Sequence, residues 1–126
     1  MLKIYLLSFL FIFSTNIKAQ SNEQIGSKMA DCAGWLFAAS FMMRDIGNGV
    51  ASTEYLRGGN ASLDIAIRLI GKTKANDSIG TGMREYNQNK ANGTLENWLP
   101  RLQSKRNECD AYLKTNNSQI RRALGQ

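Results

Sequence analysis

The chain has 126 residues, of which 43% are hydrophobic and 21% charged, with a formal net charge of +6 and no histidine. A chain of this length forms one domain with room for a hydrophobic core. The absence of histidine excludes Ser–His and Cys–His nucleophilic mechanisms, and with only two cysteines it also excludes a zinc site built from four Cys and His ligands.

The first nineteen residues have the layout of a secretory signal peptide. A short start containing Lys3 precedes an apolar run over residues 4–13, and the small Ala19 stands at the expected cleavage position. This run is shorter than the about 20 apolar residues that span a bilayer. We expect cleavage after Ala19, a single mature domain of residues 20–126 and a periplasmic or secreted location. The alternative is an uncleaved N-terminal anchor.

Charge in the mature domain is modest and scattered. Removal of Lys3 and Lys18 lowers the basic count from 16 to 14 against 10 acidic residues, a net charge of +4. Such a surface favours anionic partners, for example a cell-wall polymer or lipid head groups. Aromatic residues are not interleaved with basic ones, so together with the export signal the sequence argues against nucleic acid as a partner.

The most apolar mature stretch, residues 28–46, predicts a buried central helix. Apolar or small side chains recur there at alternating steps of three and four, and the opposite side carries Trp35 and Phe37 as well. A helix that is apolar nearly all round is normally surrounded by others. Ser27 is its predicted N-cap, after a loose polar lead-in over residues 20–26. Gly34 and Ala38 would let a second helix approach closely.

Glycine pairs predict the boundaries in the middle of the chain. Residues 52–57 can form one or two helical turns before the Gly58-Gly59-Asn60 break, although one longer helix is possible if this break is only a kink. The next helix is expected from about Ser62 to Gly71 or one turn further.

Two more helices are expected in the C-terminal half. Asp77 or Ser78 would cap a third helix that ends at residues 92–93. Thr94 would cap the last helix, with Pro100 placed in its first turn and an interruption at residues 116–118.

The two cysteines, Cys32 and Cys109, lie on the apolar faces of the first and last expected helices. In an exported protein such a pair predicts one disulfide, the alternatives being two buried thiols or a redox pair. With strand patterns sparse, the predicted fold is all-α. It is a small bundle of about four helices in which one disulfide joins the first and last helices.

No catalytic, cofactor or metal motif stands out. Gly71-Lys72-Thr73 ends like a phosphate-binding loop, but Ala66 occupies the position of the required first glycine. Glu54 and Asp64, on either side of the expected break, are the acids we considered for general acid–base chemistry, which in glycosidases needs carboxyls about 5 to 10 Å apart.

The residues we select for a candidate interface are Trp98, beside the expected helix start, and two arginines near the C-terminus, Arg121 and Arg122, where we expect the chain to be exposed. The function we expect is that of a small exported, non-enzymatic binding protein whose partner is another envelope protein. An immunity factor, a hydrolase inhibitor or an accessory protein of an envelope complex would fit. The alternative is a carboxylate-dependent enzyme or a direct binder of anionic cell-wall or membrane surfaces.

Overall fold

The computed structural model describes residues 20–126, and the predicted signal peptide lies outside this range. The described chain is all-α, which confirms the predicted class. Four long helices and one of two turns follow each other along the chain: α2 (Asn22–Asp45), α3 (Gly49–Ile70), α4 (Lys72–Ser78), α5 (Gly80–Asn92) and α6 (Leu95–Ala123). No helix of residues 20–126 has the length and hydropathy needed to cross a membrane.

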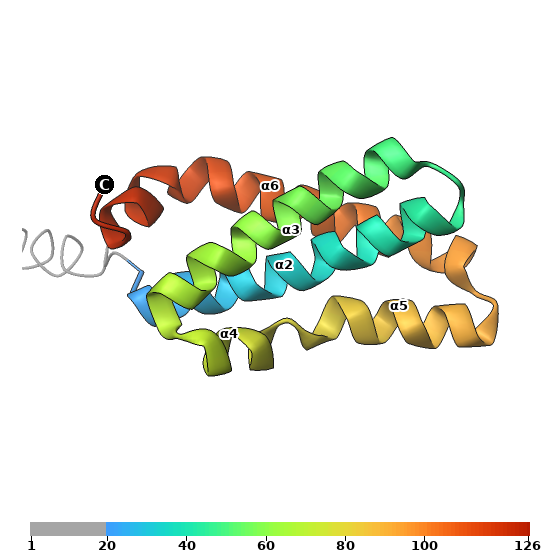
Figure 1. Ribbon diagram of the computed structural model, residues 1–126, viewed down its shortest axis with the longest axis horizontal. Coiled ribbons are helices and arrows are strands. Elements are labelled where there is room, and N and C mark those ends of the chain that lie inside the picture. The colour runs from blue at the N-terminus through green and yellow to red at the C-terminus, as the bar shows by residue number, and fades with distance from the viewer. Residues whose placement is uncertain (1–19) are drawn as a thin grey trace, which may run out of the picture.

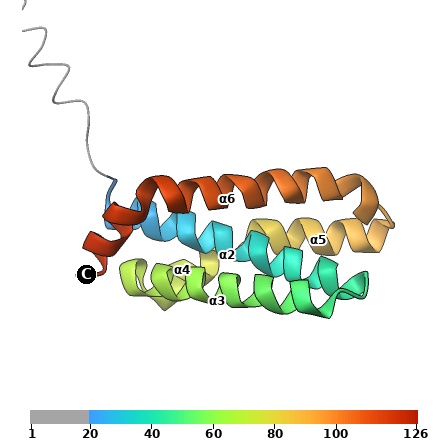
Figure 2. The same ribbon diagram turned by 90° about the horizontal axis from the view of Figure 1, so that it is seen from above.

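Helix α2 is the centre of the bundle, as its composition predicts. Figure 2 shows it running between α6 and α3, and in Figure 1 α5 lies alongside its C-terminal half. The helix starts earlier than we predicted, because Ser21 and Gln24 form a reciprocal capping box in place of a cap at Ser27. The polar lead-in is therefore helical, and it places Ile25 in the core with 1% of its surface exposed.

Helix α3 runs unbroken through Gly58 and Gly59, so the longer-helix alternative is correct and the break is not formed. The reason is tertiary packing. A Cβ atom at Gly59 would lie 2.6 Å from a ring carbon of Phe37, so a residue without a side chain lets α3 press against α2. At its start, the side chain of Asn48 accepts a hydrogen bond from the backbone N–H of Ala51.

A second close approach positions α5. A Cβ at Gly34 would fall 2.1 Å from the carbonyl oxygen of Ile79, and one at Gly82 would fall 2.8 Å from the backbone of Gly34. Gly34 thus lets α5 approach α2 closely, as we predicted from the small residues Gly34 and Ala38. The predicted caps Asp77 and Ser78 are instead inside α4.

Helix α6 is longer and more continuous than predicted. It begins at Leu95, so Pro100 lies in its second turn and not in its first, and it continues through residues 116–118 to Ala123. Thr94 precedes the helix, but its side chain bonds Asn89 and does not cap α6. The C-terminal half stays helical because it packs on α2, where Ile120 is 5% exposed.

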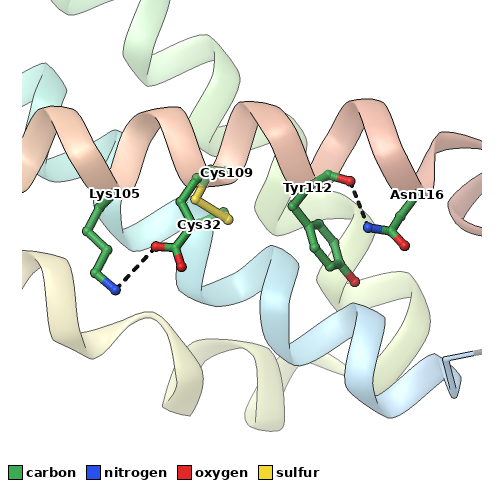
Figure 3. The surroundings of a disulfide bond; sticks show 6 residues. Cys32, Lys105, Cys109, Tyr112 and Asn116 are labelled. Atoms are coloured by element: carbon green, nitrogen blue, oxygen red, sulfur yellow. Dashed lines mark hydrogen bonds and ion pairs between the residues drawn. A yellow bond between two sulfur atoms is a disulfide. The ribbon is translucent and has the colours of Figure 1, made fainter.

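The predicted disulfide is present and joins α2 to α6, as Figure 3 shows. The Cα atoms of Cys32 and Cys109 are 5.7 Å apart, and both residues are buried. One apolar cluster surrounds Trp35 and Trp98 at one end of α2, and another surrounds Met29 and Ile120 at the other end. The bond therefore fixes α6 to the middle of the central helix.

Candidate functional site

A groove of about 420 Å³ opens between α3 and α6. Helix α2 forms its floor through Met29, which is fully buried, and Leu36, which is 9% exposed. Ile65 on α3 and Leu113 on α6 form apolar walls. The volume is in the usual range for ligand pockets, about 300 to 1,000 Å³.

The groove exists because α3 presents small residues to it. Gly58, Ala61 and Ser62 line this part of the wall, at the i, i+3 and i+4 spacing that places them on one helical face. Helix α6 cannot move over to fill the gap, because the disulfide at Cys109 holds it against α2. The next residue, Asp110, lines the groove.

Charged and aromatic groups form the rim. Arg106 on α6 donates a short hydrogen bond to the hydroxyl of Tyr55 on α3, and its guanidinium lies 5.5 Å from the centre of that ring. Glu54 and Asp110 are exposed, and neither forms an ion pair with any residue in the range 20–126. With two carboxylates and one guanidinium, this rim has a formal charge of −1 although the chain is basic.

Trp98, the first predicted interface residue, is in the core and only 5% exposed. It stacks on Trp35 with ring centres 6.1 Å apart, and its indole N–H donates to Glu85 at 3.0 Å. Arg101 donates to both oxygens of Glu85 and lowers the pKa of that carboxyl. We therefore correct the expectation that Trp98 is presented to a partner, because these contacts use it to close the bundle.

Arg121 and Arg122 are exposed in the last turns of α6. Arg122 lines a separate hollow of about 250 Å³ beside the start of α2. At a helical rise of about 1.5 Å per residue, Trp98 lies roughly 35 Å from Arg121 along α6. The structure does not bring the three predicted interface residues together.

The acids Glu54 and Asp64 do not form a catalytic pair. They belong to the same unbroken α3, about 15 Å apart along its axis at the usual helical rise, which exceeds the spacing needed in glycosidases. Asp64 is occupied by an ion pair with Arg68 at 3.2 Å. Glu54 instead shares the groove with Asp110. In the described part of the chain no three His, Cys, Asp or Glu residues cluster as metal ligands would.

A third polar cluster connects the end of α2 to α5. Tyr86 donates a short hydrogen bond to Asp45, and this bond lowers the pKa of the carboxyl. Lys90 lies 3.4 Å from the other carboxylate oxygen. Burial and the neighbouring carboxylate raise the pKa of Tyr86. These groups satisfy one another, so the cluster joins two helices and has no unpaired charge to offer a ligand.

In residues 20–126, fold and groove together define an all-α, disulfide-linked bundle with an open, partly apolar cleft along its central helix. No protein-family model, curated protein or solved structure matches this chain.

Sequence reasoning missed Tyr55, Arg106 and Asp110 as groove residues. The signal that could have pointed to them is the run of small residues at 58–62, of which we interpreted residues 58–60 as a helix break.

Proposed function

We propose that this chain is a small exported, non-enzymatic protein that acts by binding another protein of the cell envelope. The observation that supports this proposal best is the groove between α3 and α6, because its apolar floor and charged rim offer both burial and orientation to a binding partner. A disulfide is typical of exported proteins. An immunity factor, a hydrolase inhibitor or an accessory protein of an envelope complex would use such a surface.

The disulfide also suits a binding role physically. It links residues 77 positions apart and holds one wall of the groove on the floor helix. A groove that is already formed loses less conformational entropy on association than one that must be ordered by its partner.

Affinity capture tests this proposal. The oxidised domain, residues 20–126, is immobilised and exposed to an envelope extract, then washed at about 0.1 M and about 1 M salt, where the screening length falls from about 10 to about 3 Å. A single protein retained at high salt in stoichiometric amount supports the proposal. Capture of no protein, in repeated experiments with the oxidised domain, would refute it.

A carboxylate-dependent activity on envelope glycans is a second candidate, because Glu54 and Asp110 line the same groove. It predicts that the oxidised domain releases soluble fragments from cell-wall material and that Glu54→Gln or Asp110→Asn abolishes this release. Absence of any fragments would exclude it.

Direct binding to an anionic polymer or membrane is a third candidate, because Arg121 and Arg122 are exposed and the mature charge is +4. It predicts capture of glycan or lipid that disappears at high salt.

A further inference from the structure

We propose that the groove receives a lysine or arginine side chain from the partner protein, with its aliphatic stem on the floor and its charged end between Glu54 and Asp110. This inference rests on the proposed function, because it names the chemistry by which the partner is recognised. It is carried by the shape of the groove, by its two carboxylates without an ion-pair partner in residues 20–126 and by the net negative charge of its rim.

The floor and walls fit the stem of such a side chain. Met29 and Leu36 lie beneath it, and Ile65 and Leu113 face each other across it from α3 and α6. Lysine and arginine carry three or four methylene groups that pack on apolar surface while the charge stays in water. The exposed rim provides that water at the end of the groove.

The rim favours a cation over an anion. Glu54 stands on the α3 side and Asp110 on the α6 side, and both are exposed without an ion-pair partner in residues 20–126. Arg106, the cation of this rim, is bound to the hydroxyl of Tyr55 and lies over the face of its ring. A carboxylate entering the groove would meet two like charges and one guanidinium, whereas an ammonium or guanidinium would meet two carboxylates without an ion-pair partner and one like charge, so the net charge of −1 favours the cation.

A protein side chain suits the groove better than a lipid chain. The groove is open along its length, since Glu54, Ala61 and Asp110 are all exposed. An open groove leaves one side of a bound acyl chain in water, which removes much of the gain from burial. A side chain presented by a protein is covered from that side by the partner's own surface.

Three matched peptides test the charge preference. They are acetyl-Ala-Leu-Lys-Leu-Ala-amide and the same sequence with glutamate or norleucine at the centre, added to the oxidised, ¹⁵N-labelled domain and followed by amide chemical shifts. We expect the lysine peptide to shift the amides of residues 54–65 and 106–113 and to bind most tightly of the three. Tighter binding of the glutamate peptide, or shifts confined to other helices, would overturn the proposal. A third outcome would also overturn it: no peptide shifts these amides, but phosphatidylglycerol vesicles cause their signals to disappear. That result would assign the groove to a lipid surface.

Paired variants test the two carboxylates. In Glu54→Gln/Asp110→Asn we expect binding of the lysine peptide to weaken by about tenfold, the order expected for two partly exposed charge contacts. The control, Asp77→Asn/Glu96→Gln, removes the same net charge from exposed acids that form no ion pair within residues 20–126 and lie outside the groove. Equal affinity in both variants, with unchanged urea midpoints, would refute a role for the rim carboxylates.

The same variants separate this inference from the proposed function. If the wild-type domain captures one envelope protein at high salt and Glu54→Gln/Asp110→Asn captures it equally well, the binding function stands and the groove inference fails. If the wild-type domain captures no protein, the proposed function fails whatever the peptides do. If Glu54→Gln/Asp110→Asn loses capture while Asp77→Asn/Glu96→Gln retains it, the result supports both the binding function and the groove inference.

Discussion

Two adjacent glycines in α3 allow the packing of the bundle to be measured. Gly58 and Gly59 have ordinary helical backbone, because neither is among the described residues with positive φ. Alanine at either position removes the same backbone freedom from the unfolded chain, which stabilises a helix by about 0.5 to 1 kcal/mol. The difference between the two variants therefore reports only what the new methyl group contacts in the folded protein.

At Gly58 a Cβ would lie 3.6 Å from the Cδ1 atom of Leu36, an ordinary van der Waals contact. At Gly59 it would lie 2.6 and 2.7 Å from two ring carbons of Phe37, so the ring or the helix must move. Overpacking of this kind costs typically about 1 to 3 kcal/mol. We expect Gly58→Ala to raise the free energy of unfolding by about 0.5 to 1 kcal/mol, and Gly59→Ala to lower it by roughly 0.5 to 2 kcal/mol.

Urea denaturation followed by circular dichroism at 222 nm measures both changes, and thermal unfolding provides a check, since 1 kcal/mol shifts the midpoint of a domain this size by about 4 to 8 °C. Gly82→Ala provides a third comparison, because there the added methyl group would meet backbone and not a side chain. There the added methyl would meet the backbone of Gly34 and Trp35 at 2.8 Å, which no side-chain rotation can relieve, so we expect the largest loss of the three. Equal stabilisation by Gly58→Ala and Gly59→Ala would refute the argument that Gly59 sets the distance between α2 and α3.

Two further predictions concern the disulfide and an ion pair. Cys32→Ser and Cys109→Ser should lower stability by similar amounts, at most about 4 to 5 kcal/mol for a loop of this length, and the double variant should be little worse; unequal and additive losses in urea would contradict the pairing. The hydrogen bonds from Arg101 lower the pKa of Glu85 below its ordinary value of 4.5, so their stabilisation is complete above that pH and is lost as the pH falls through the lowered value. Glu85→Gln should therefore make unfolding less sensitive to acid below about pH 4.5, and an unchanged pH profile would show that this pair does not contribute.

The central helix and the disulfide could be predicted because both depend on local periodicity. The apolar steps around Cys32 and Cys109 place each cysteine on a buried helical face, and with two cysteines in the sequence a single pairing is possible. The helix boundaries could not be predicted in the same way. Gly58-Gly59 and residues 116–118 weaken a helix when considered alone. In the bundle Gly59 packs on Phe37 of α2, and core residues on both sides of residues 116–118, Leu113 and Ile120, hold this part of α6 in place.

The groove was harder to predict because it is a space between two helices, left where the side chains of α3 are small. Nothing local to Glu54 or Asp110 indicates that helices α3 and α6 bring them to one cavity, since they are 56 positions apart in the sequence. Trp98 illustrates the opposite error. An aromatic residue beside a helix start is as compatible with an interface as with a core, and only its stacking on Trp35 decides between them.

The small residues of α3 have two different effects on two faces of one helix. On one face Gly59 lets the backbone approach Phe37, and on the next Gly58, Ala61 and Ser62 leave space above the floor of the groove. Glycines inside a helix reduce its stability, so this run has a cost that packing on α2 must offset. The disulfide then prevents α6 from closing the space that the small residues leave, since Cys109 is held 5.7 Å from Cys32 between Cα atoms. Reduction of this bond should therefore weaken binding of the lysine peptide even under conditions in which the reduced domain stays folded.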